Sequence, residues 1–169
     1  MWRMVNVYLV GRANHVSGDD MPISQKSQYA VRAVFELAKR QGKGATKIGE
    51  ISEAQAIPQR FLENILNHLK GGGFVESLRG KDGGYLLARP AEELTVGEIL
   101  RFVQGPLAPV TCGVGRDKTS CSMYGRCAFL SLWARAEKAL EAVYDGTTFQ
   151  ELVIEEATGC REGFLDYSI

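Results

Sequence analysis

The stretch from Thr46 to Ala88 constrains the fold more than any other, because it joins two short amphipathic helices to a β-hairpin. Ile48 and Ile51 give the first helix an apolar edge, and Thr46 is placed to cap it. Pro58 suits the first turn of a second helix, whose apolar side chains recur at helical spacing. These apolar side chains are Leu62, Ile65, Leu66 and Leu69. The pattern predicts a helix-turn-helix.

The opposite face of the second helix has side chains that can hydrogen-bond base edges or phosphates. They are Gln59, Arg60, Glu63, Asn64, Asn67 and Lys70. Phe74 to Leu78 and Tyr85 to Leu87 are typical of two strands joined by a glycine-rich loop. Arg79 and Lys81 place two cations in that loop, where a DNA backbone could meet them. A helical hairpin with a solvated polar face would leave this wing unexplained, so the pattern favours DNA binding.

The distribution of charge supports this interpretation, although the formal net charge is +0. Residues 21–90 hold eleven Lys and Arg against six Asp and Glu, a surplus of five positive charges. Residues 91–169 hold seven against twelve, a surplus of five negative charges. A basic half joined to an acidic half suits a DNA-reading module with a separate sensing or dimerising module.

We expect a mainly α-helical chain with a small hairpin wing, divided into five segments. A helix capped by Ser24 should run to about Arg40, and the sequence Thr95-Val96-Gly97-Glu98 is a capping box that should start another. The expected segments are a disordered extension (1–20), a winged helix-turn-helix domain (21–104), a cysteine-containing loop (105–128), a dimerisation helix with a short C-terminal helix (129–158) and a flexible tail (159–169). The short C-terminal helix should start at Thr147 with Gln150 or at Thr148 with Glu151.

The long helix of the fourth segment has a seam of alternating three- and four-residue spacing, which is typical of helix pairing. Its members are Leu130, Trp133, Glu137, Leu140 and Tyr144. Apolar side chains on a lone projecting helix would be exposed unless a second copy covered them. The seam therefore predicts a homodimer that binds double-stranded DNA at a palindromic operator.

Three of the four cysteines are close together ahead of the long helix. Cys112, Cys121 and Cys127 are separated by eight and five residues, whereas Cys160 stands apart in the tail. Three thiolates in one glycine-rich loop can converge on an iron–sulfur cluster or on Zn²⁺. The spacing therefore predicts a metal centre at these three residues and an idle Cys160.

The sequence resembles the Rrf2 family of bacterial regulators, especially its iron–sulfur members of the IscR and NsrR type. The resemblance covers Pro22 to about Glu156. It rests on SQKSQYAVRAVFELA, on IGEISEAQAIPQRFLENILNHLKGGGFVESLRGKDGGYLLARP, on LTVGEIL, and on a cysteine loop followed by LW. It implies a winged helix-turn-helix whose long C-terminal helix crosses to a second subunit.

The same resemblance implies roles for individual residues. Residues 59–70 would enter the major groove, Arg79 would reach the minor groove, and Glu63 would help to choose between DNA site types. The three cysteines would hold an iron–sulfur cluster of two or four irons, with zinc the weaker alternative. No fourth ligand carries over, since Leu130 stands where IscR-type members have a His, and Gln28 where NsrR-type members have an acidic residue.

Other functions are weaker but distinct. A regulator of the same family could lack a cluster, keep an idle or zinc-bound cysteine loop and respond to a metabolite or protein partner. An enzyme is not expected, because there is no Ser/His/Asp set and no phosphate-cradling glycine loop. No stretch approaches the roughly 18 to 20 apolar residues that span a bilayer, so we expect a cytoplasmic protein. The sequence leaves open the signal, the operator, and activation versus repression.

Overall fold

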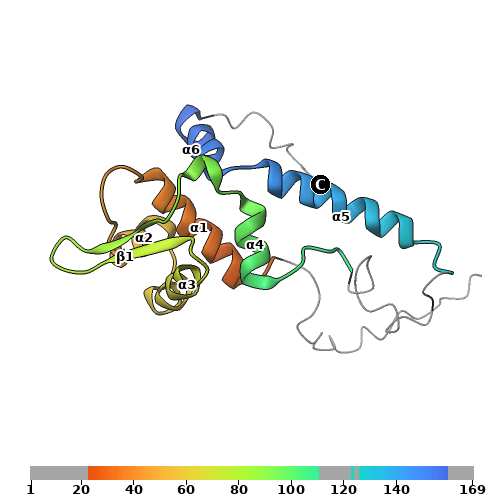
Figure 1. The fold of residues 1–169 in the computed structure, drawn as a ribbon, viewed down its shortest axis with the longest axis horizontal. Helices are drawn as coiled ribbons and strands as arrows, with labels where there is room; N and C mark the ends of the chain where they lie inside the picture. Colours follow the sequence, from red (N-terminus) through yellow and green to blue (C-terminus); the bar gives the residue numbers. More distant parts are fainter. Residues whose placement is uncertain (1–22, 111–122, 124–125, 160–169) are drawn as a thin grey trace, which may run out of the picture.

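The computed structural model describes residues 23–110, 123 and 126–159 (Figure 1). Its elements in chain order are α1 (Gln25–Lys39), α2 (Ile48–Gln55), α3 (Gln59–Gly71), β1 (Val75–Leu78), β2 (Gly84–Leu87), the short 3₁₀ helix η1 (Ala91–Glu93), α4 (Val96–Gln104), α5 (Leu130–Gly146) and α6 (Phe149–Thr158). The described chain is mainly helical with one antiparallel two-stranded hairpin, as the sequence predicts.

Helix α1 is the centre of the core and packs against α2, α3, α4 and α6. It begins where the sequence places it, because the Ser24 hydroxyl accepts a hydrogen bond from the Ser27 N–H at 3.2 Å. Ala30, Ala33 and Val34 have no exposed surface. Small side chains at such contacts let the neighbouring helices approach closely, which is why α1 can serve as the backing of the helix-turn-helix.

The turn between α2 and α3 depends on Ala56, which adopts a left-handed conformation at φ 47°. Ser52 donates a hydrogen bond to the Ile57 carbonyl at 2.7 Å, and the Ile57 side chain is 1% exposed. Pro58 occupies the N-cap of α3, one position before the first turn that the sequence suggested. The predicted apolar face of α3 is buried in full.

The predicted capping role of Thr46 is wrong. Lys47 is the N-cap of α2, and its N–H donates to the Glu50 carboxylate at 2.9 Å. Thr46 is instead 3% exposed and forms an antiparallel bridge with Tyr85, with both backbone hydrogen bonds at 2.8 Å. The bridge is favoured over a capping role for Thr46 because it satisfies the backbone groups of both residues. It also anchors the wing to the start of α2.

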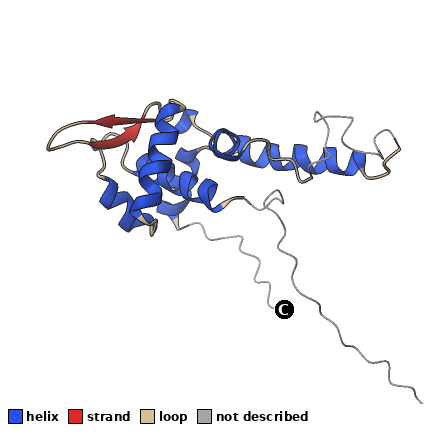
Figure 2. Ribbon diagram, turned by 90° about the horizontal axis from the view of Figure 1, so that it is seen from below, coloured by secondary structure: helices blue, strands red, loops and turns tan. Residues whose placement is uncertain are grey.

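The wing is an antiparallel hairpin whose register runs from Val75↔Leu87 to Leu78↔Gly84. Val75 and Leu87 are buried against the helical core, whereas Leu78, next to the loop, is 53% exposed. The hairpin extends from one end of the domain, and α5 extends from the other (Figure 2).

Helices α4 and α6 both pack against α1, and α5 extends away from them (Figure 1). The predicted capping box at Thr95 and Glu98 is present, and of the two starts proposed for the last helix the structure uses Thr148 with Glu151. Phe149 returns the chain to the core with no exposed surface. None of the described helices is long and apolar enough to cross a membrane.

Candidate nucleic-acid interface

The outer face of α3 is polar and open to solvent. All six of the polar residues predicted there (Gln59, Arg60, Glu63, Asn64, Asn67 and Lys70) are exposed, while Leu62, Ile65, Leu66 and Leu69 hold the helix to the core. The Arg60 guanidinium lies 4.6 Å from the centre of the Phe61 ring, and Asn64 donates to the Arg60 carbonyl at 3.3 Å. The helix therefore presents donors and acceptors of several kinds on a rigid support.

The wing lies beside this face and is tied to it. The Lys70 ammonium donates to the Ser77 hydroxyl at 2.5 Å, which joins the last turn of α3 to β1. Arg79 and Lys81 are exposed in the loop between the strands, as predicted. The structure thus brings all eight predicted DNA-contacting residues onto α3 and the adjacent wing.

The wing's position depends on contacts that the sequence did not reveal. The Thr46–Tyr85 bridge fixes β2, and a Cβ placed on Gly84 would collide with the backbone of Thr46. A Cβ on Gly83 would similarly collide with the Leu78 carbonyl. The paired glycines at the end of the loop were the available signal, because adjacent glycines in a hairpin indicate close backbone approach.

Among the described residues, no carboxylate pairs with the cations of this surface. The ion pairs of the described residues involve other side chains, and Arg60, Lys70, Arg79 and Lys81 belong to none of them. Exposed cations on a helix and on the hairpin beside it are suited to contact DNA phosphates. Glu63 is the acidic exception among the predicted residues, and it can only accept hydrogen bonds or repel phosphate when ionised.

Two ion pairs fix the helix that precedes the cysteine loop. Arg101 on α4 holds Asp145 at the end of α5 through two bonds of 2.6 and 3.0 Å, and the hydrogen bond to Asp145 raises the pKa of Arg101. A Cβ on Gly97 would collide with the Asp145 carboxylate, so glycine permits this pairing.

At the start of α4, Glu98 pairs with Arg89 at 2.6 Å. Burial opposes its ionisation, but hydrogen bonds from the Thr95 backbone and from Arg89, together with the charge of Arg89, outweigh burial and lower the pKa of Glu98. This end of α4 is therefore held by an ionised carboxylate.

The predicted metal ligands are only partly within the described residues. Cys112, Cys121 and the idle Cys160 lie outside them. Cys127 is half-buried just ahead of α5, and its carbonyl accepts a hydrogen bond from the Leu130 N–H at 3.3 Å. Within the described ranges, no three His, Cys, Asp or Glu side chains are grouped to hold a metal. Gln28 stands where NsrR-type members have an acidic residue, and its side-chain amide donates a hydrogen bond to the Ile23 carbonyl at 2.8 Å.

Helix α5 has no buried residue. The apolar members of the predicted seam are half-buried, and a second stripe one position earlier is more open. Phe129, Leu132 and Val143 in this stripe are 59%, 46% and 63% exposed. The two stripes adjoin, so α5 presents one broad apolar face.

Comparisons with known proteins agree with this geometry. The Rrf2 family, described as "Iron-dependent Transcriptional regulator", matches residues 23–155. The transcriptional regulator CymR of Bacillus subtilis is 32% identical over 147 residues, covering 87% of this chain and 99% of CymR. The regulator IscR of Serratia proteamaculans is 32% identical over 133 residues, covering 79% of each chain.

The solved structure of CymR, the global cysteine regulator of B. subtilis, superposes with a TM-score of 0.65 at 30% identity. It covers 79% of this chain and 97% of CymR. The exposed face of α3, the cationic wing and these matches lead to one conclusion: the chain belongs to the Rrf2 family of winged helix-turn-helix transcriptional regulators and is a DNA-binding protein, not an enzyme.

Proposed function

We propose that this regulator binds a palindromic operator as a homodimer, with α3 in the major groove and the wing in the minor groove. The observation that supports this most directly is the row of exposed polar side chains on α3 beside the exposed cations of the wing. Arg60, Asn64 and Asn67 would hydrogen-bond base edges, and Lys70 and Lys81 would neutralise phosphates. Arg79 would enter the minor groove, where its charge is favoured by the negative potential.

Glu63 and Gln59 have a selective role in this proposal. A carboxylate on the recognition face accepts a hydrogen bond from a cytosine amino group but is repelled where phosphates crowd it. Glu63 would therefore exclude some sites as well as favour others, and Gln59 at the first turn would add an adaptable donor and acceptor.

The apolar face of α5 supports dimerisation. Phe129, Leu132 and Val143 leave a row of large apolar side chains open on a helix that stands away from its own core (Figure 2). A second copy of the same helix is the partner that such a self-complementary stripe suits. Two recognition helices would then lie about 34–36 Å apart, one turn of the duplex.

We further propose that Cys112, Cys121 and Cys127 hold an iron–sulfur cluster of two or four irons. The family description as iron-dependent supports this, and three thiolates are a soft donor set suited to such a cluster. A cluster bound there would supply an iron that reacts with oxidants or nitric oxide. Cys127 lies three residues before the first residue of α5, and its carbonyl accepts a hydrogen bond from Leu130, so a change in what it ligates would affect the start of the proposed dimer helix.

Anaerobic purification followed by absorption spectroscopy tests the cluster, and DNA-binding assays with and without it test the regulation. A broad visible band that is lost in Cys127→Ala and kept in Cys160→Ala would support the proposal. The similarity to CymR favours a second candidate, a regulator without a cluster that responds to a metabolite or protein partner. A metal-free or colourless zinc-containing protein with full operator affinity would favour that candidate. In either case the protein would act where the chromosome is, in the cytoplasm.

A further inference from the structure

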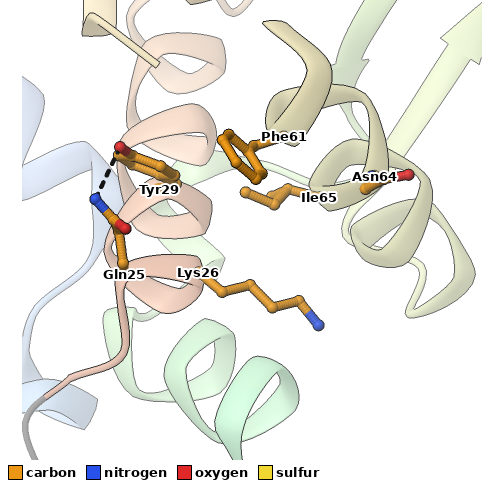
Figure 3. A pocket seen from close by; sticks show the side chains of 6 residues that line it. All are labelled: Gln25, Lys26, Tyr29, Phe61, Asn64 and Ile65. Atoms are coloured by element: carbon orange, nitrogen blue, oxygen red, sulfur yellow. Dashed lines mark hydrogen bonds between the residues drawn. The ribbon is translucent and has the colours of Figure 1, made fainter. Parts of the chain in front are cut away.

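An open pocket of about 330 Å³ lies between the N-terminal half of α1 and the flank of α3 (Figure 3). Its lining residues are Gln25, Lys26 and Tyr29 from α1, and Phe61, Asn64 and Ile65 from α3. The volume is at the lower end of the roughly 300–1,000 Å³ that small-molecule sites occupy. The pocket borders the recognition helix but lies away from the wing.

Two aromatic rings form the walls of the pocket, and both are restrained by neighbours. Tyr29 accepts a hydrogen bond from the Gln25 amide at 3.0 Å, and Arg60 lies 4.6 Å from the centre of the Phe61 ring. Phe61 is nevertheless 45% exposed, and Ile65 behind it is almost fully buried. The rings therefore leave an apolar slot that is formed in advance of any ligand.

The charge of the lining is one-sided. Among the described residues, Lys26 is the charged member of the lining and no carboxylate lines the pocket. Lys26 takes part in none of the ion pairs that these residues form. Gln25 and Asn64 add amide groups at the edge. An apolar slot with one exposed ammonium and adjacent amides is complementary to a small anion that has a flat apolar body.

We propose that this pocket binds a small carboxylic acid with a single aromatic ring, and that its occupancy weakens DNA binding. The ring would fill the slot between Tyr29 and Phe61, and the carboxylate would pair with Lys26. Phe61 and Asn64 belong to α3, so a ligand would place a negative charge beside the helix that faces DNA phosphates. The effect on DNA rests on the proposed function, whereas the binding itself does not.

The binding is tested on the full-length protein by ¹H–¹⁵N NMR titration with phenylacetate as the probe. We expect saturable shifts at Gln25, Lys26, Tyr29, Phe61 and Asn64, with a dissociation constant on the order of 1 mM, as suits a probe of this size. The neutral 2-phenylethanol should bind more weakly, and the cationic 2-phenylethylamine weakest. No saturation, the reverse order of affinity, or shifts confined to other residues would overturn the proposal.

Substitutions separate the contribution of the Lys26 charge to binding from that of the apolar slot. Lys26→Met should weaken phenylacetate by about threefold to fivefold and leave 2-phenylethanol within about twofold, because it removes an exposed charge but keeps the length of the side chain. Phe61→Leu should weaken both probes. Lys43→Met, the same change at an exposed lysine outside the pocket, should alter neither. Equal affinity in Lys26→Met and the unchanged protein would refute the role of the ammonium.

The regulatory step is tested by fluorescence anisotropy with a DNA duplex that the protein has enriched from a randomised library. Saturating phenylacetate should lower the affinity for this duplex at least about fivefold, the low end of common allosteric couplings, and sodium acetate at the same ionic strength should not. Binding in the pocket with unchanged DNA affinity would overturn the regulatory half of the proposal. If no duplex is selected at all, the proposed DNA-reading function fails, while the NMR titration still decides the pocket.

Discussion

Replacing Gly84 with alanine should detach the wing from the rest of the domain. The new Cβ would collide with the Thr46 backbone, so the bridge between Thr46 and Tyr85 must open. This bridge has two backbone hydrogen bonds of 2.8 Å, and Thr46 is 3% exposed. Each such bond contributes about 0.5–1.5 kcal/mol, so the free energy of unfolding should fall by about 1–3 kcal/mol.

The same change should weaken DNA binding by displacing Arg79. A groove-reading arginine contributes about 1–3 kcal/mol, which corresponds to about 5- to 150-fold in affinity. If Gly84→Ala acts through Arg79, then the double variant with Arg79→Ala should bind little worse than Arg79→Ala alone. Urea unfolding measures the stability, and anisotropy with a selected duplex measures the affinity.

Gly49→Ala is the matched control. Gly49 lies in α2 with nothing within 4 Å of an added Cβ, so alanine there should leave stability unchanged or raise it by up to about 1 kcal/mol. The reasoning is refuted if Gly84→Ala matches the unchanged protein in both stability and affinity, or if its effect adds fully to that of Arg79→Ala.

Three further outcomes are expected. Glu63→Ala should alter the ranking of sites in a randomised duplex library more than the overall affinity, and an unchanged ranking would remove its selective role. Phe149→Ala should lower the free energy of unfolding by about 3–5 kcal/mol in urea, because the ring has no exposed surface; a loss below about 1 kcal/mol would contradict its place in the core. The lowered pKa of Glu98 stabilises the fold fully above the unfolded value near 4.5, and this contribution is lost as the pH falls through the folded pKa. Glu98→Gln should therefore flatten the loss of stability below about pH 4.5, and a variant with the same acid transition as the unchanged protein would show that the pairing with Arg89 contributes nothing.

The elements of the fold were predictable from sequence because their signals are local. Helical spacing marks α3, and the boxes at Thr95 and Thr148 mark the starts of α4 and α6. The local pattern at Thr46 predicts a cap, because a threonine ahead of a helix has the same local appearance in both roles. Its actual partner, Tyr85, is far away in sequence, so only the folded chain shows the bridge.

The candidate site was likewise predictable where its features follow from a local sequence pattern, and not where they depend on contacts between distant segments. A polar stripe on one helix predicts an exposed face, and the exposure of Asn67 and Arg60 follows from the periodicity of the stripe. The Lys70–Ser77 hydrogen bond and the pocket between Tyr29 and Phe61 depend on how separate elements pack, which no local pattern encodes. In α5, the seam residues are half-buried and the most open apolar stripe is offset by one position, because the face that the helix turns outward is set by its contact with α4.

Selection of DNA from a randomised duplex library tests the central claim most directly, with the unchanged protein and an Arg60→Ala/Asn67→Ala variant side by side. The unchanged protein should enrich a palindrome whose half-site centres are about 10–10.5 base pairs apart or a multiple of that spacing. The variant should keep its fold by circular dichroism and lose the base preference within each half-site while keeping the spacing. Enrichment of the same sequence by both proteins, or of no palindrome by the unchanged protein, would contradict the assignment of α3 as the reading helix of a dimer.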